Sequence, residues 1–276
     1  MMSATIPETI VVVGFGWVGQ ANALALVRMG YPVYFYDVVT PPRHYVKEYG
    51  ALYEKIKLLS GLRAADSPDT WYIVCIGDRV SPEGVQDITF ITRALEELRG
   101  VAGKVILRST VLPSSLASLP FDLYVPEFLH ELKAVEECLN PYFFVLGERR
   151  SLPLPGFLKE WEARSYKQFR GTPEEAAHIK YLSNVWNAVR VAFVNEFGDS
   201  LGLPVNAAAR EANERILDFV LERGSYLRYG QGYGGHCLPK DMRAYAAAKR
   251  SIRPVPLLDG AQEANARHEA VVNQYA

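Results

Sequence analysis

A glycine-rich segment that leads into a cysteine is the part of the sequence best suited to covalent chemistry. Residues 230–241 read GQGYGGHCLPKD, with four glycines in the first six positions. Such glycine density indicates unusual backbone angles or the close approach of another group. Cys237 stands where a helix is expected to begin, and exposed amides there, with Lys240, would stabilise the nucleophilic thiolate. Asp241 follows one helical turn later and could reach the same space. The alternative interpretation is that Cys237 is a buried structural cysteine beside a flexible loop.

A second glycine pattern, near the start of the chain, predicts a dinucleotide site. The apolar run at 10–13 leads directly into GFGWVG at 14–19 and then into a helical stretch. In this context the first glycine permits a tight turn, the second admits a pyrophosphate, and the third lets helix and strand pack closely. Asp37 ends the next expected strand, and its carboxylate favours NAD over NADP because it suits a free ribose hydroxyl. The alternative is a simple tight turn with an aspartate cap. The expected cofactor residues here are Gly14, Gly16, Trp17, Val18, Gly19 and Asp37.

The elements that must position these groups alternate between β-branched runs and longer helical stretches up to Gly147. This alternation is typical of a parallel sheet with crossover helices. Expected strands cover residues 10–13, 33–36, 71–76, 104–107, 123–125 and 143–146, with an edge strand near 166–169. Their nearly continuous apolar character fits a sheet covered on both faces. We therefore predict an α/β fold with an N-terminal Rossmann-type doubly wound parallel sheet.

The second half of the chain is expected to be all helical. Thr172 and Pro173 are typical of a helix start, and a long helix should follow to about Leu201. Further helices are expected over 205–221, over 240–249 and from 255 onward. The predicted domains are therefore an NAD-binding domain, 1–172, and a helical central domain, 173–276. The long helix carries a stripe of apolar residues at helical spacing: Ile179, Leu182, Trp186, Val189 and Phe193. This stripe predicts the core of a homodimer or, alternatively, a core within one chain.

Composition excludes several classes of function. The 276 residues are 49% hydrophobic, and 30 basic against 31 acidic residues give a net charge of -1, so we expect neither nucleic acid nor a membrane as partner. Cys75, Cys138 and Cys237 are odd in number and widely spaced, which argues against a disulfide framework and a metal site. The apolar stretch at 9–27 is broken by glycines and follows no basic segment, so we expect a cytoplasmic protein without a signal peptide.

Several segments resemble the UDP-glucose/GDP-mannose dehydrogenase family. Its catalytic signature is a glycine pair, a variable residue, cysteine, another residue and Pro-Lys-Asp, which residues 234–241 match. Other matches follow in the expected order: STV at 109–111, PEFLHE at 126–131, KYLSN at 180–184 and VNEF at 194–197. The resemblance covers nearly the whole chain. It implies an NAD-dependent oxidation of a nucleotide sugar, or of a related sugar phosphate, from primary alcohol to carboxylate in two hydride transfers.

The resemblance also implies a role for each matching residue. Cys237 would capture the intermediate aldehyde as a thiohemiacetal that becomes a thioester. Lys180 and Asn184, four apart on one helix face, would stabilise the oxygen that becomes negative, although ordinary helix polarity is the alternative. Asp241 would assist water or proton transfer. Thr110 and Glu127 would place the water that cleaves the thioester. Glu131 would lie in the substrate loop, and Ser109 and Thr110 would lie beside the cofactor.

Two departures leave other functions open. Usual family members have a third, nucleotide-binding domain that this sequence lacks, so we expect a shortened member. The family's Val-x-Thr-Pro turn after the third strand is replaced by Cys75-Ile76-Gly77-Asp78. The alternatives are a catalytically silent or partner-dependent NAD-binding subunit, paired with a separate nucleotide-binding chain, and a shortened dehydrogenase for a smaller, non-nucleotide substrate.

Overall fold

The computed structural model of the chain describes residues 8–130, 133–202, 206–221, 227 and 229–275. These residues fall into two compact units. The first contains the chain up to Asp78 together with Ile88–Lys180, and the second contains Arg79–Asp87 together with the chain from Tyr181. The boundary therefore falls within one long helix, and the domain division that we expect between residues 172 and 173 stays a prediction.

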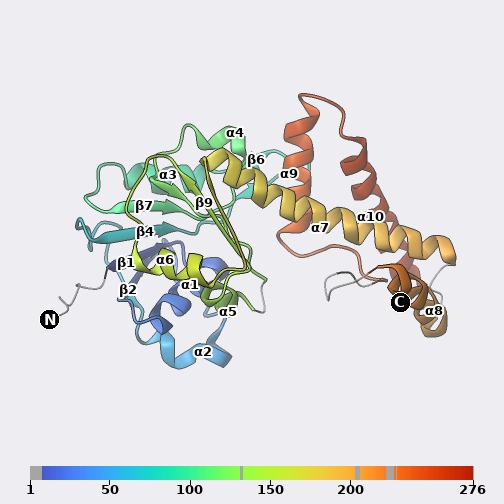
Figure 1. The fold of residues 1–276 in the computed structure, drawn as a ribbon, viewed down its shortest axis with the longest axis horizontal. Helices are drawn as coiled ribbons and strands as arrows, with labels where there is room; N and C mark the ends of the chain where they lie inside the picture. The colour runs from blue at the N-terminus through green and yellow to red at the C-terminus, as the bar shows by residue number, and fades with distance from the viewer. Residues whose placement is uncertain (1–7, 131–132, 203–205, 222–226, 228, 276) are drawn as a thin grey trace. The chain divides into compact units, whose positions relative to one another are not determined.

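The first unit is built on an eight-stranded sheet, shown in Figure 1. The strand order is β10-β9-β8-β7-β4-β1-β2-β3, and every pair is parallel except β8 with β9. This sheet confirms the predicted α/β class. The strands are β1 Thr9–Val13, β2 Val33–Tyr36, β3 Lys57–Leu58, β4 Thr70–Val74, β7 Lys104–Leu107, β8 Leu123–Tyr124, β9 Phe143–Glu148 and β10 Lys167–Gly171.

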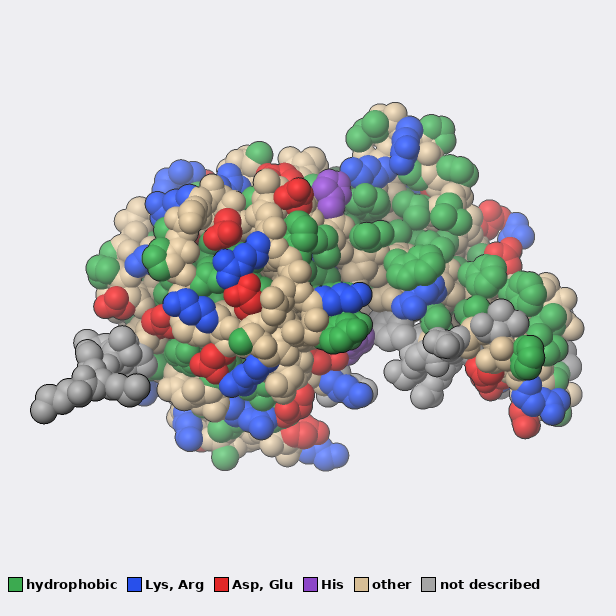
Figure 2. Space-filling view, viewed as in Figure 1, with side chains coloured by type: hydrophobic (Ala, Val, Ile, Leu, Met, Phe, Trp, Pro, Cys, Tyr) green, Lys and Arg blue, Asp and Glu red, His purple; other side chains and the backbone are tan. Residues whose placement is uncertain are grey.

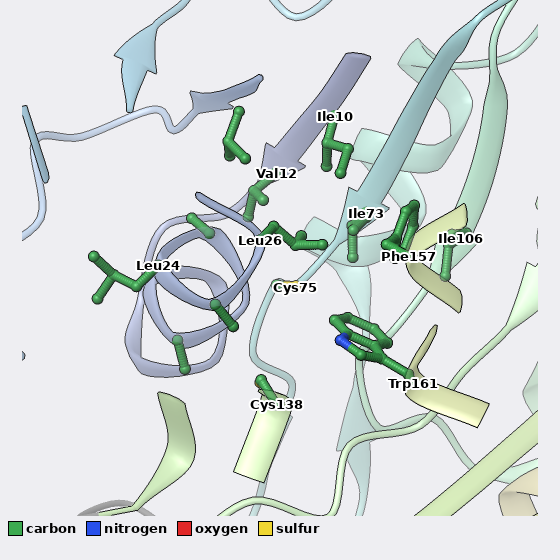
Figure 3. Packing of buried hydrophobic residues seen from close by; sticks show 14 of the residues in the cluster. Ile10, Val12, Leu24, Leu26, Ile73, Cys75, Ile106, Cys138, Phe157 and Trp161 are labelled. Atoms are coloured by element: carbon green, nitrogen blue, oxygen red, sulfur yellow. The ribbon is translucent and has the colours of Figure 1, made fainter. Parts of the chain in front are cut away.

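Helices cover both faces of this sheet, which explains why its strands are apolar on both sides. Ile10 and Val12 of β1 belong to one hydrophobic core, together with α1 (Trp17–Arg28), α5 (Ala134–Leu139) and α6 (Gly156–Arg164). Figure 3 shows part of this core around Cys75, Cys138 and Trp161. Val11 and Val13 belong to the other core, with α3 (Thr89–Glu97) and α4 (Pro113–Leu116). The short helix α2 (Val46–Tyr53) packs beside α1.

The long helix α7 (Pro173–Leu201) begins as the sequence predicts. The Glu175 N–H donates to Thr172 Oγ1 at 3.2 Å, and the Thr172 N–H donates to Glu175 Oε2 at 2.8 Å. This reciprocal pair is a capping box, which satisfies backbone N–H groups that a helix start leaves unpaired. The α7 residues Ala176 and Ala177 join the second core of the sheet unit.

In the part of the second unit that the structure describes, the regular elements are helices and one small hairpin. Its helices are the part of α7 from Tyr181, α8 (Ala207–Val220), α9 (Leu238–Arg250) and α10 (Pro256–Tyr275). The hairpin of β5 (Arg79–Val80) and β6 (Gln86–Asp87) lies against α9, where a Cβ on Gly84 would meet Ala247 Cβ at 2.6 Å. Among the helices that the structure describes, none has the length and apolar character to cross a membrane.

Candidate active site

The turn between β1 and α1 has the geometry that a dinucleotide site needs. Gly14 has a φ of +86°, a region that L side chains rarely adopt. A Cβ on Gly19 would lie 2.0 Å from the Gly14 carbonyl oxygen, so strand and helix approach too closely for any side chain there. A Cβ on Gly16, by contrast, would meet nothing within 4 Å. The backbone at Gly16 therefore faces open space at the N-terminus of α1.

Asp37 follows β2 and lies against the same turn. Its carboxylate accepts the Phe15 N–H at 2.6 Å and the Val39 N–H at 3.1 Å. The Trp17 indole stacks on the His44 ring with the centroids 3.9 Å apart, while Val18 packs partly into the core. The fingerprint residues and the acidic residue are thus brought together as the sequence predicts.

Ser109 and Thr110 are buried just beyond the carboxyl end of β7. The N–H and hydroxyl of Ser109 both donate to the Val74 carbonyl oxygen, at 3.2 and 3.3 Å. Ser109 therefore joins the ends of β4 and β7, the two strands on one side of β1. Open parallel sheets bind ligands beyond the carboxyl ends of their strands, which is where this residue lies.

Glu127 and Lys180 form a buried ion pair in the first unit. Lys180 Nζ lies 3.0 Å from Glu127 Oε1, and the two side chains are 4% and 9% exposed. The Leu129 N–H donates to the other carboxylate oxygen at 2.8 Å. Burial alone would raise the pKa of the Glu127 carboxyl, but the Lys180 ammonium and the Leu129 N–H hold that pKa below its ordinary value. Glu127 is therefore a charged acceptor at neutral pH.

Asn184 and Asp241 form a second buried pair, in the helical unit. Asn184 Nδ2 donates to Asp241 Oδ2, and Lys240 Nζ donates to Asp241 Oδ1 at 2.7 Å. Cys237 directly precedes α9, and its carbonyl oxygen accepts the Asp241 N–H at 2.9 Å. Cys237 is exposed and is not part of a disulfide. The nucleophile candidate is thus one turn of helix from a buried carboxylate that already holds two donors.

Arg108, which precedes the Ser-Thr motif, is a buried residue that sequence reasoning missed. It is 6% exposed, donates from Nη1 to the Val125 carbonyl oxygen at 3.1 Å, and lies 5.0 Å from the centre of the Trp161 ring. Its charge also lowers the pKa of Glu127. Only its position beside Ser109 pointed to it. Glu131, in contrast, is a predicted site residue that lies outside the described residues.

Comparison with known proteins finds that the chain is similar to sugar-nucleotide dehydrogenases. Residues 174–267 match the profile of the UDP-glucose/GDP-mannose dehydrogenase family, central domain. A GDP-mannose 6-dehydrogenase of Pseudomonas putida is 29% identical over 93% of this chain and 67% of its own length. A UDP-glucose 6-dehydrogenase of Campylobacter jejuni is 27% identical over 96% of this chain and 74% of its own length.

A solved structure shows the same fold. The UDP-glucose dehydrogenase of Pyrobaculum islandicum superposes with a TM-score of 0.77 and 22% identity, over 97% of this chain and 70% of the other. The protein is thus a two-part α/β chain in which a Rossmann-type sheet precedes a helical domain. Its residues 174–267 match the central domain of the UDP-glucose/GDP-mannose dehydrogenase family, and the chain spans about two thirds of the length of these relatives.

Proposed function

We propose that the protein is an NAD-dependent dehydrogenase that oxidises the primary alcohol of a nucleotide sugar, or of a related sugar phosphate, to a carboxylate. The observation that carries this proposal is the exposed Cys237 at the start of α9, one turn from the buried Asn184–Asp241 pair. The names of the curated relatives, GDP-mannose and UDP-glucose 6-dehydrogenase, support the substrate class. The three cysteines are not joined in disulfides in the described part of the chain, as is typical of proteins in a reducing cytoplasm, the setting that we propose.

The residues of the β1–α1 turn fit NAD. Gly16 leaves open space at the N-terminus of α1, where a pyrophosphate would bind, and the Asp37 carboxylate follows β2, where it would accept ribose hydroxyls. When bound there, NAD+ supplies the acceptor for the hydride. Trp17, Val18, Ser109 and Thr110 would complete the walls of the cofactor site.

Cys237 would divide the oxidation into two steps. Its Sγ adds to the carbonyl carbon of the intermediate aldehyde, and the carbonyl oxygen gains the proton that the thiol loses. When the same carbon gives a second hydride to a second NAD+ and its hydroxyl loses a proton, Cys237 would hold the acyl group as a thioester. Water then cleaves the carbon–sulfur bond, which releases the carboxylate and restores the thiol. Asp241 would take the proton from that water.

Lys180 and Asn184 would stabilise the negative oxygen in each step. They are four residues apart on α7, so they project from one side of that helix. Each already donates to a carboxylate, Lys180 to Glu127 and Asn184 to Asp241. These carboxylates fix the donors in place before the substrate arrives, which reduces reorganisation during the reaction. Glu127 with Thr110 would place the hydrolytic water, and Glu131 would contact the substrate.

The test is NADH formation by the purified protein with NAD+ and a panel of UDP-sugars, GDP-sugars, free sugars and sugar phosphates. We expect turnover of at least one sugar nucleotide or sugar phosphate. NAD binding without turnover of any of these compounds would contradict the proposal and favour an NAD-binding subunit that depends on a partner chain. Turnover of a free sugar alone would favour the smaller-substrate alternative.

We also propose a homodimer formed through α7. Within the predicted stripe, Ile179 and Val189 pack into the cores of their own units, whereas Leu182, Trp186 and Phe193 are exposed. Figure 2 shows hydrophobic side chains gathered over the helical unit. Exposed apolar side chains in this number are typical of a surface that another chain covers.

A further inference from the structure

We infer that Asn195 and Asn265 are positioning residues that hold the loop before Cys237 and thereby fix the place of the nucleophile. The inference rests on the proposed role of Cys237. We define the glycine loop as residues 229–236, which lead directly to Cys237. Asn195 lies on α7 and Asn265 on α10, and both side chains are more than nine-tenths buried.

Asn195 holds the first part of the glycine loop from α7. Its Oδ1 accepts the Gly230 N–H at 2.9 Å, and its Nδ2 donates to the Gln231 carbonyl oxygen at 2.8 Å. In a strand or helix, these backbone N–H and C=O groups would bond to other backbone groups. Here the Asn195 side-chain amide takes that place. Gly230 has a φ of +83°, so the backbone turns sharply where it is held.

Asn265 holds the middle of the glycine loop from α10. Its Oδ1 accepts the Tyr233 N–H at 2.7 Å, and its Nδ2 donates to the Tyr233 carbonyl oxygen at 3.3 Å. The loop lies so close to α10 here that a Cβ on Gly232 would be 2.9 Å from Glu269 Cγ and 3.0 Å from Asn265 Oδ1. A side chain at position 232 would therefore have to displace the Glu269 or Asn265 side chain, which agrees with the close approach of another group, one of the two explanations that the glycine density suggests.

Tyr229 anchors the start of the glycine loop to α7, one helical turn beyond Asn195. Its ring lies over Gly198, where a Cβ would be 2.2 Å from a ring carbon. Its hydroxyl donates to Asp199 Oδ1 at 2.9 Å, and Asp199 Oδ2 lies 2.7 Å from Nδ1 of the buried His268. Asp199 therefore connects the loop to α10 as well as to α7.

These contacts explain why an asparagine is needed at each position. Four of the eight residues in the glycine loop are glycines, and at these positions the loop can be held only through its backbone N–H and C=O groups. An amide presents one acceptor and two donors, and each asparagine uses both kinds. An aspartate has nearly the same shape but only acceptors, and it would face a backbone carbonyl oxygen without a proton between them.

The test compares Asn195→Asp and Asn265→Asp with Val191→Ala, a core variant on α7 that leaves the loop's hydrogen bonds intact. Three quantities are measured on the full chain: kcat and KM, the rate at which iodoacetamide modifies Cys237, and amide hydrogen exchange in residues 229–237. Both asparagine variants should lower kcat about tenfold or more with little change in KM, because a displaced nucleophile affects the reaction more than binding. They should also slow Cys237 alkylation about threefold or more, because the thiol loses the amides at the start of α9.

Exchange in the glycine loop should rise in both asparagine variants and stay unchanged in Val191→Ala, even where the Tm falls equally. The inference would be overturned if both asparagine variants kept the Cys237 alkylation rate and the amide exchange of the wild type. It would also be overturned if Val191→Ala changed these two quantities as much as the asparagine variants do. If the wild-type protein makes no NADH, the proposed function fails, and exchange and alkylation alone decide the inference. If the aspartate variants do not fold, Asn195→Ser and Asn265→Ser, which bury no charge, replace them with the same expectations.

Discussion

Glu127 and Lys180 stabilise one another because each is a charge removed from water. Replacing Glu127 by glutamine removes the negative charge 3.0 Å from the buried Lys180 ammonium, which we expect to lower the free energy of unfolding by roughly 3–5 kcal/mol at pH 7. Urea denaturation measures this change. Glu160→Gln, in a half-exposed pair with Arg164, is the control and should cost less than about 1 kcal/mol. Equal losses in both variants would contradict this account.

The same pair makes stability depend on pH in a definite direction. The folded protein holds the pKa of Glu127 below its ordinary value of 4.5, so its stabilisation is complete above that pH and is lost as the pH falls through the lower folded value. The difference in unfolding free energy between wild type and Glu127→Gln should therefore shrink from pH 7 to pH 3. Urea midpoints at each pH measure it, and a difference independent of pH would contradict the assignment.

The three cysteines should differ sharply in reactivity. Burial raises the pKa of Cys75 to about 12 and that of Cys138 to about 11, whereas Cys237 is exposed. Because the thiolate is the reactive form, iodoacetamide at pH 7.5 should modify one thiol per folded chain and none in Cys237→Ala. Mass spectrometry counts the adducts, and all three thiols should react in urea. Modification of Cys75 or Cys138 in the folded protein would refute this difference.

At the residue scale, the sequence motifs identified the residues of the candidate site but not which of them pair with one another. The identities of Cys237, Lys180 and Asn184 follow from short motifs, because their spacing is local. The Glu127–Lys180 pair joins residues 53 positions apart, and only the folded chain brings them together. Arg108 stayed hidden because a buried arginine and an exposed one look alike in sequence.

The β1–α1 turn offers a matched pair of variants at the element scale. Gly19→Ala places a Cβ 2.0 Å from the Gly14 carbonyl oxygen and should cost about 3 kcal/mol or more, because backbone must move. Gly16→Ala places a Cβ in open space and should cost less than about 1 kcal/mol. Yet Gly16→Ala should weaken NAD binding about tenfold or more, since the methyl occupies the space of the pyrophosphate. Thermal unfolding and calorimetric titration with NAD+ separate the effects, and unchanged NAD affinity in Gly16→Ala would argue against a cofactor site there.

The elements were largely predictable where burial or capping controls them. The apolar runs of β1, β2, β4 and β7 and the Thr172 cap of α7 follow from sequence, because both sheet faces and the helix start have strict requirements. The strands β3, β5 and β6 were not predicted. Each has two residues that are exposed or only partly buried, so no hydrophobic pattern marks them. The grouping of residues 79–87 with the helical unit depends on long-range packing against α9, which a local pattern does not contain.

At the scale of the whole molecule, the exposed face of α7 should be buried in a dimer. Light scattering should give twice the mass of the chain, and replacing the 55% exposed Trp186 by glutamate should give the single mass, because a charge would be buried in the interface. Leu58→Glu, at an exposed apolar position on β3 of the sheet unit, is the control and should leave the mass unchanged. A wild-type protein with the mass of one chain would contradict the proposed dimer.

In the proposed reaction, Cys237 allows a four-electron oxidation of one carbon, because it holds the intermediate aldehyde for the second hydride transfer. The most direct test is the number of NADH molecules formed per molecule of substrate consumed, for the wild type and for Cys237→Ala with the same substrate. We predict two for the wild type with a carboxylate product, and for the variant no more than one and no carboxylate, because no thioester can form. Two NADH per substrate in Cys237→Ala, or one NADH and an aldehyde from the wild type, would contradict the account.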